Sequence, residues 1–213
     1  MHSKRLTAAF DMASALHASQ TRKSLGTPYL SHLLGVASLI IEHGGDEDHV
    51  IAGLLHDAVE DCGGLPVLDD IRREFGDVVA DTVMECSDSV TVDAGAKLAW
   101  EDRKRTYIAA VAGKSARARF VTTCDKLHNA VSILNDHHLG AGDDGATVWD
   151  RFGGKSPAQT VAYYSAMVAA LQGRVDAAVW QRLAVTVAAL EDVVEDRREH
   201  GDWVDRLRLP ASA

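Results

Sequence analysis

The segment 54–61 brings an imidazole and several carboxylates into a short stretch of chain. His56 and Asp57 are adjacent, and Glu60 and Asp61 follow one helical turn later. Residues four apart share one face of a helix, so His56 is expected beside Glu60 and Asp57 beside Asp61. Clustered carboxylates repel one another unless a cation holds them together, and a divalent metal does this well. The segment therefore predicts a metal site.

Two distant residues complete the set of ligands that the sequence offers. His32 lies near the start of a second segment with apolar residues at helical spacing, and Asp125 lies inside a third. Any one of these residues alone is more easily explained as a packed histidine or a solvated carboxylate. Two imidazoles and two carboxylates together suit Mn, Fe, Zn or Mg. We therefore predict that one divalent ion is bound by His32, His56, Asp57 and Asp125.

Glu60 and Asp61 are the candidates for acid-base chemistry. A solvated helix end is the alternative explanation for such a pair. However, acidic residues near the C-terminus of a helix are poorly placed for the helix dipole, so stability does not favour them there. Carboxylates one turn beyond a metal site are well placed to hold a water molecule and to accept its proton.

Composition limits the classes of function. The 213 residues are 46% apolar and 25% charged, as in ordinary globular proteins, and predict a single domain over residues 1–213. The net charge of −9 argues against a nucleic-acid partner, which needs a basic face. It still permits a small anionic substrate if local cations and a metal outweigh it. No segment has the apolar length of a membrane span. Three widely spaced cysteines indicate no disulfide framework, so we expect a cytoplasmic protein.

The spacing of apolar residues predicts an all-α chain. Alanine is abundant, and the alternation typical of β-strands is nearly absent. We expect a core at about 5–172 and a C-terminal helix at about 175–200. The remaining helices are predicted over residues 4–19, 29–43, 46–61, 66–75, 77–86, around 100–107, 116–139 and from 156 onward.

The order of His, then His-Asp, then Asp resembles the HD superfamily of metal-dependent phosphohydrolases. The surrounding segments are more specific. Arg22-Lys23, the run 26–32 (GTPYLSH), Glu60-Asp61 and the run 125–129 (DKLHN) resemble the hydrolase domain of the RelA/SpoT family. The compact form of that domain is the small alarmone hydrolase. The resemblance runs from about residue 5 to about residue 172 and implies an HD-domain helical bundle.

The resemblance also implies roles for individual residues. In that family the Glu-Asp pair positions the attacking water and assists proton transfer, which assigns catalysis to Glu60 and Asp61. Arg22 is expected to pack against the nucleobase and Lys23 to lie near the phosphates. The other residues implied or considered as substrate contacts are Lys97, Asn129 and Tyr163.

The implied activity is removal of the 3′-pyrophosphate from a nucleotide alarmone, (p)ppGpp or (p)ppApp, with Mn²⁺ or another divalent metal as cofactor. Two alternatives remain: another HD-type nucleotidase or phosphodiesterase, and an HD module that senses a nucleotide without cleaving it. The intact Glu60-Asp61 pair argues against a sensor. Val131 stands where many members carry Arg, and the segment 87–97 fits the family poorly. Guanine or adenine specificity and the oligomeric state therefore stay open.

Overall fold

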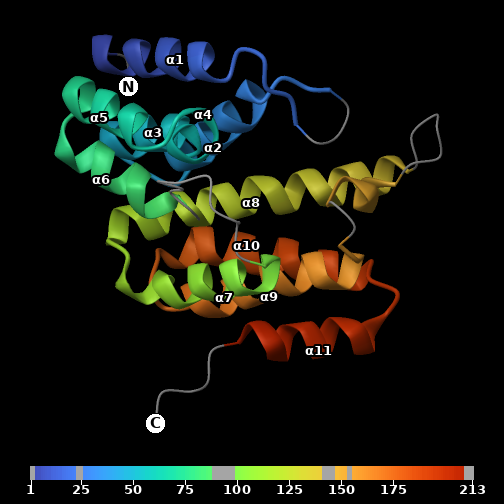
Figure 1. The fold of residues 1–213 in the computed structure, drawn as a ribbon. Coiled ribbons are helices and arrows are strands. Elements are labelled where there is room, and N and C mark those ends of the chain that lie inside the picture. The colour runs from blue at the N-terminus through green and yellow to red at the C-terminus, as the bar shows by residue number, and fades with distance from the viewer. Residues whose placement is uncertain (1–2, 23–25, 88–98, 141–146, 153–154, 209–213) are drawn as a thin grey trace. The chain divides into compact units, whose positions relative to one another are not determined.

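The computed structural model describes residues 3–22, 26–87, 99–140, 147–152 and 155–208. Apart from one isolated bridge between Thr21 and Pro28, the regular structure of these residues is helical (Figure 1). The all-α prediction is confirmed. None of the described helices combines the length and the apolar character that crossing a membrane requires.

A first compact unit comprises residues 1–98 and 114–125. Helix α3 is central to it and contacts α1, α2 and α6. All residues of α3 from Val50 to Leu55 are buried. The helices of this unit are α1 (Lys4–Leu16), α2 (Leu30–Glu42), α3 (Glu47–Leu55), α4 (Ala58–Cys62), α5 (Leu65–Phe75), α6 (Asp77–Cys86) and the first part of α8 (Ala116–Leu139).

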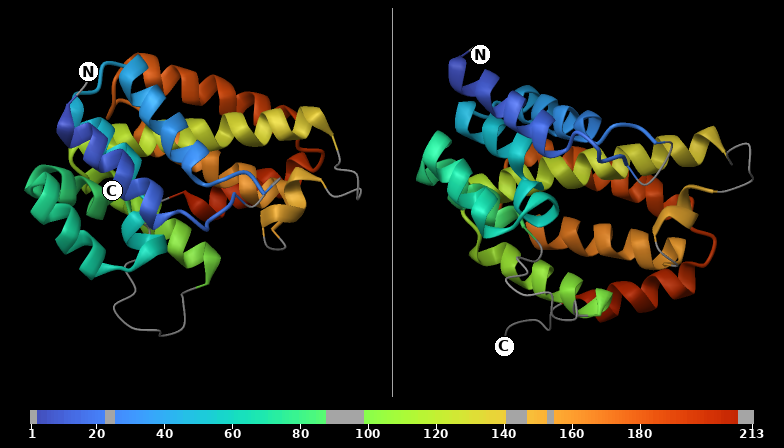
Figure 2. Two further views of the ribbon diagram at one scale, coloured as in Figure 1. Left: turned by 90° about the horizontal axis from the view of Figure 1, so that it is seen from above. Right: turned by 45° about the horizontal axis from the view of Figure 1, so that its top comes forward.

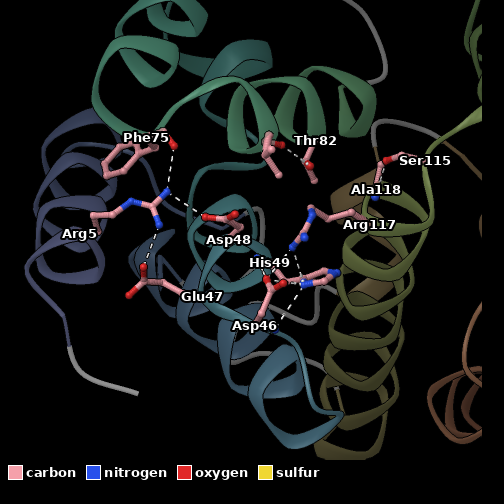
Figure 3. Close-up of polar contacts among 11 residues, drawn as sticks. Arg5, Asp46, Glu47, Asp48, His49, Phe75, Thr82, Ser115, Arg117 and Ala118 are labelled. Carbon is pink, nitrogen blue, oxygen red and sulfur yellow. Dashed lines mark hydrogen bonds and ion pairs between the residues drawn. The ribbon is translucent and has the colours of Figure 1, made fainter.

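Local signals explain where α3 begins and how closely it packs. The Asp46 carboxylate accepts a hydrogen bond from the backbone N–H of His49, as expected of an N-cap residue. Gly53 allows α2 to approach, because a Cβ there would lie 2.4 Å from the Cδ1 atom of Ile40. Arg5 of α1 also bonds the first turn of α3 (Figure 3). The approach at Gly53 places the C-terminal half of α3 against α2, while Arg5 ties its first turn to α1.

The predicted continuous helix over 46–61 is wrong. Helix α3 ends at Leu55 and α4 begins at Ala58, so His56 and Asp57 occupy a turn between two helices. The His56 Nδ1 atom lies 2.8 Å from the carbonyl oxygen of Gly53, and side-chain bonds of this kind compete with helix continuation. The backbone of Asp57, at φ −97° and ψ −5°, also departs from helical values.

A second compact unit comprises residues 99–113 and 126–213. Helix α9 contacts α7, α10 and α11, and Figure 2 shows this group in green, orange and red. Ser156 caps α9 by accepting from the backbone N–H of Gln159. The elements are α7 (Trp100–Ala110), η1 (Val111–Gly113), the rest of α8, η2 (Val148–Phe152), α9 (Pro157–Leu171), α10 (Ala177–Asp192) and α11 (Arg197–Leu207).

The single C-terminal helix predicted for 175–200 is also wrong, because the chain there forms α10 and α11. Asp196 caps α11 by accepting from the backbone N–H of Glu199. The Ser156 hydroxyl donates to the Glu199 carboxylate at 2.7 Å and ties α11 to the start of α9. A single functional domain over residues 1–213, with a core at about 5–172, stays a prediction.

Candidate metal centre

The four predicted ligands lie together in the first unit, although three separate parts of the chain supply them. The Nε2 atom of His32 lies 3.3 Å from Asp125 Oδ1 and 3.7 Å from Asp57 Oδ2. The Nε2 atom of His56 lies 3.0 Å from Asp57 Oδ2 and 3.6 Å from Asp125 Oδ1. Two imidazole nitrogens and two carboxylate oxygens therefore converge on one small volume.

The ring of His56 is oriented for coordination. Its Nδ1 atom faces the carbonyl oxygen of Gly53, which can only accept, so Nδ1 carries a proton. The Nε2 atom then points toward Asp57 and Asp125. It is buried, and its contacts with these two carboxylates, at 3.0 and 3.6 Å, do not have hydrogen-bond geometry. A buried polar atom without a partner costs free energy, and a metal ion would satisfy it.

The pKa values of the two histidines are shifted in opposite directions. Burial is the largest single effect on both rings and lowers the pKa of each; for His32 it prevails over the neighbouring carboxylates, so its pKa lies below the ordinary value. For His56 the charge of Asp57 and the contact with Asp125 outweigh burial, so its pKa lies well above the ordinary value. Burial raises the pKa of Asp57, but the charge and contact of His56 and the charge of His32 together outweigh it, so the net shift is downward. A metal held by these residues would compete with a proton for Nε2 of His56.

Tyr29 supports the centre, although its sequence context did not single it out. Its hydroxyl donates to Asp57 Oδ2 at 2.5 Å. Burial and the charge of Asp57 raise the pKa of Tyr29, so it stays a neutral donor. The ring meets His32 edge-on, with centroids 5.4 Å apart, and stacks on His17 at 5.2 Å. Its place three residues before His32, within one helical turn, was the available signal.

The two catalytic candidates lie in the first turn of α4, just after the turn that holds Asp57. The expectation that they sit at a helix C-terminus, disfavoured by its dipole, is therefore wrong, because negative charge is favourable near a helix N-terminus. The backbone N–H of Asp61 donates to the Asp57 carbonyl at 2.9 Å, so the four-residue spacing of these two aspartates is helical despite the break. Glu60 is half-buried and Asp61 is exposed. Asp61 Oδ2 accepts a hydrogen bond from Gln20 Nε2 at 2.8 Å.

Arg22 precedes α2 in the chain, and its backbone N–H donates to the carbonyl oxygen of Thr27 at 2.8 Å. Lys23, which was predicted to contact substrate together with Arg22, lies outside the described residues, as does Lys97.

The remaining predicted substrate contacts belong to the second unit. Asn129 follows Asp125 by one turn of α8. Tyr163 of α9 is buried, and the Nζ atoms of Lys104 and Lys126 lie 4.7 and 5.8 Å from its ring centroid. The Tyr163 hydroxyl is buried and has no hydrogen-bond partner in the described part of the chain. An aromatic ring beside two ammonium groups is chemically suited to a phosphorylated base.

Comparison with known proteins identifies the family. The sequence pattern of the HD domain matches residues 9–159, which is more than half of the chain. The chain belongs to the HD-domain family. This HD domain is related to human guanosine-3′,5′-bis(diphosphate) 3′-pyrophosphohydrolase MESH1, at 38% identity over 128 residues that cover 59% of this chain and 67% of that protein. The four clustered residues include the His-Asp pair from which the family takes its name.

Two further similarities place this HD domain among its relatives. A GTP pyrophosphokinase of Streptomyces coelicolor is 37% identical over 126 residues, 59% of this chain but only 14% of that protein. A solved structure described as a metazoan ortholog of SpoT that hydrolyses ppGpp has a TM-score of 0.68 and 26% identity. It covers 88% of this chain and 96% of the solved chain. The helical fold of the HD domain is therefore shared with that protein.

Proposed function

We propose that this HD domain is a metal-dependent pyrophosphohydrolase that removes the 3′-pyrophosphate from a guanosine or adenosine alarmone. The observation that carries the proposal is the convergence of His32, His56, Asp57 and Asp125, with the buried Nε2 atom of His56 unsatisfied by the described protein groups. The relationship to MESH1, whose name states this activity, supports the choice of substrate.

The donor set fits a divalent metal of intermediate hardness. The four residues offer the Nε2 atoms of two imidazoles and one oxygen from each of two carboxylates, a mixture of donors that suits Mn, Fe, Zn or Mg. Among these metals we propose Mn²⁺ as the cofactor. When bound, such a cation supplies positive charge against the phosphoryl oxygens and makes water a better nucleophile.

The residues of the chain have separate tasks in the proposed reaction. The carboxylates of Glu60 and Asp61 hold the attacking water and accept its proton. Water oxygen forms a bond to the 3′-linked phosphorus, and the bond between that phosphorus and the ribose 3′-oxygen breaks. The ribose oxygen takes a proton and pyrophosphate leaves. Tyr29 holds one oxygen of Asp57 and so limits the rotation of that carboxylate.

Substrate binding must overcome a net charge of −9. A guanidinium forks onto phosphate and stacks on bases, which suits Arg22 for both parts of a nucleotide. Lys23, Lys97 and Asn129 are proposed to contact phosphate or sugar. Tyr163, with Lys104 and Lys126 beside its ring, is proposed to contact the nucleotide.

A product analysis tests this function. The purified chain is incubated with Mn²⁺ and, separately, with ppGpp, ppApp, deoxynucleoside triphosphates and cyclic nucleotides. We expect pyrophosphate and a 3′-hydroxyl nucleotide from an alarmone. Cleavage of a 5′-nucleotide alone would support the nucleotidase alternative, whereas binding without any product would support a nucleotide sensor.

A further inference from the structure

A chain of hydrogen bonds links the end of α1 to the carboxylate of Asp61. The Nδ1 atom of His17 lies 2.6 Å from Oε1 of Gln20, and Nε2 of Gln20 donates to Oδ2 of Asp61 at 2.8 Å. His17 and Gln20 lie far from Asp61 in sequence, and neither was predicted to belong to the site. The three side chains form a continuous path within the first unit.

Elementary chemistry determines the direction of this chain. An ionised carboxylate can only accept hydrogen bonds, so the NH₂ group of Gln20 must face Asp61. The amide oxygen of Gln20 therefore faces His17, and the Nδ1 atom of His17 must carry a proton. Each donor has one acceptor, and the chain leaves no choice of amide orientation or imidazole tautomer.

Gln20 is held at its backbone as well as at its side chain. Its N–H donates to the His17 carbonyl at 3.0 Å, and its carbonyl accepts from the N–H of Tyr29 at 2.9 Å. Ordering a glutamine side chain costs conformational entropy, and a fixed backbone reduces the freedom that remains to be lost. Gln20 is therefore a preorganised donor rather than an exposed side chain that meets Asp61 occasionally.

The ring of His17 is fixed in turn. It is 3% exposed and stacks on Tyr29, with an interplanar angle of 23°. Cys62 lies against it, with Sγ 3.6 Å from Nδ1, and burial raises the pKa of that thiol to about 11. The thiol is thus neutral at physiological pH and brings no charge to the ring. Because Tyr29 also bonds Asp57, one aromatic pair supports both a predicted metal ligand and a predicted catalytic carboxylate.

We propose that Gln20, oriented by His17, is a positioning residue that holds the Asp61 carboxylate in the direction required to accept the proton of the attacking water. The proposal rests on the proposed function of Asp61. A neutral amide can orient a carboxylate without neutralising it, whereas Lys or Arg in the same place would reduce its basicity. Gln20 touches neither substrate nor metal in this account and acts only through Asp61.

The hydrogen bonds can be tested without any substrate. In ¹⁵N-labelled protein, the side-chain amide signals of Gln20 are assigned by their loss in Gln20→Leu. We expect them to move upfield in Asp61→Ala and to change again in His17→Phe, which keeps an aromatic ring against Tyr29. The amide signals of Gln181, exposed on α10, serve as the control. Unchanged Gln20 signals in Asp61→Ala would overturn the chain.

The role in turnover is tested by a double-mutant cycle. Gln20→Leu should lower kcat roughly tenfold with little change in KM, because one hydrogen bond to a charged group is lost from the catalytic step. In an Asp61→Asn background, the same Gln20→Leu substitution should cause no further loss. A purely structural role would instead give the same loss in both backgrounds, and that result would overturn the proposal.

Two outcomes separate this proposal from the function on which it rests. If the wild type cleaves none of the nucleotides in the panel, the proposed function fails and the role of Gln20 in turnover fails with it. If the wild type is active on any of them and Gln20→Leu is equally active, only the positioning role fails. Gln181→Leu should retain full activity in either case.

Discussion

At the N-terminal end of α3, guanidinium groups neutralise the carboxylates. Arg5 bonds both Glu47 and Asp48 at 2.8 Å, and Arg117 bonds Asp46 at 2.5 Å (Figure 3). The cluster also favours the helix, because negative charge is stabilising near a helix N-terminus. Each of its three carboxylates bonds a guanidinium group of the chain, and the cluster joins α1 and α8 to α3.

At the opposite end of the same helix, the carboxylates have different partners. Asp57 bonds Tyr29 and lies beside the imidazoles of His32 and His56, and Asp61 bonds Gln20. Beside Asp57, the imidazoles of His56 and His32 or a bound cation can supply positive charge. The type of partner, rather than the presence of acidic residues, distinguishes a structural cluster from a candidate metal site.

The largest expected effect comes from removing an imidazole from the candidate metal site. His56→Ala should abolish metal binding and turnover, because it removes the buried Nε2 atom and leaves a charged cavity. The matched control is His49→Ala, which removes the imidazole at the other end of α3. Elemental analysis after metal loading should find about one Mn²⁺ per chain in the wild type and in His49→Ala only. Equal metal content in all three proteins would remove His56 from the metal site.

The next largest effect compares two pairs of consecutive Glu and Asp residues, Glu60-Asp61 and Glu47-Asp48. Replacing Glu60 and Asp61 by Gln and Asn should lower kcat on the order of a hundredfold or more while metal binding is retained. The same change at Glu47 and Asp48 should leave kcat unchanged and lower Tm, because it removes the partners of Arg5. Steady-state kinetics and thermal unfolding distinguish the pairs. Full activity of the variant with Gln and Asn at positions 60 and 61 would contradict the catalytic role of Glu60 and Asp61.

A smaller effect is expected for the arginine that we assign to substrate. Arg22→Ala should raise the KM for a 3′-pyrophosphorylated nucleotide roughly tenfold, with less effect on kcat, because ground-state binding of base and phosphate is lost. Arg73→Ala is the control, since Arg73 is exposed on α5 and pairs with Asp70. A fall in kcat at unchanged KM would place Arg22 in the chemical step instead.

The smallest expected effect is a pH-dependent change in Tm at the cluster around the N-terminus of α3. The hydrogen bond from Arg117 lowers the pKa of Asp46 below its usual range. A lowered carboxyl pKa stabilises the fold above the unfolded value of about 4, and this contribution is lost as pH falls through the folded value. The Tm difference between the wild type and Arg117→Met should therefore be largest near neutral pH and shrink below about pH 3. A difference independent of pH would show that Arg117 acts through packing alone.

Local sequence signals predicted many helix limits correctly. The span 77–86 and the span 116–139 agree with α6 and α8, and the start of α9 follows from Ser156 and Pro157. Caps and prolines act within a few residues of the helix end, so they can be recognised in the sequence. The two wrong predictions, at 46–61 and 175–200, have another cause. In 46–61 the apolar spacing continues through the break, whereas residues 195–202 carry no apolar side chain, so periodicity gives no limit there. The contacts that accompany the breaks involve side-chain bonds that periodicity does not report.

For the candidate site too, the sequence indicated some residues and missed others. The residue types and their order indicated His32, His56, Asp57 and Asp125 as ligands, because few other tasks require two imidazoles and two carboxylates. Gln20 and His17 were missed, since an amide and a lone histidine have many ordinary uses and their sequence positions are far from Asp61. The roles of the two histidines and two aspartates as metal ligands, and of Glu60 and Asp61 as catalytic groups, stay predictions.

By itself, the sequence determined the helical class, most helix limits and the chemical identity of the metal-binding candidates, because these depend on local periodicity and on side-chain type. Tertiary structure decided which atoms meet. The close approach of α2 to α3 at Gly53, the turn at His56 and the arrival of α8 bring Nε2 and Oδ atoms within 4 Å of one another. Such distances depend on packing between segments far apart in the chain, and no local pattern encodes them.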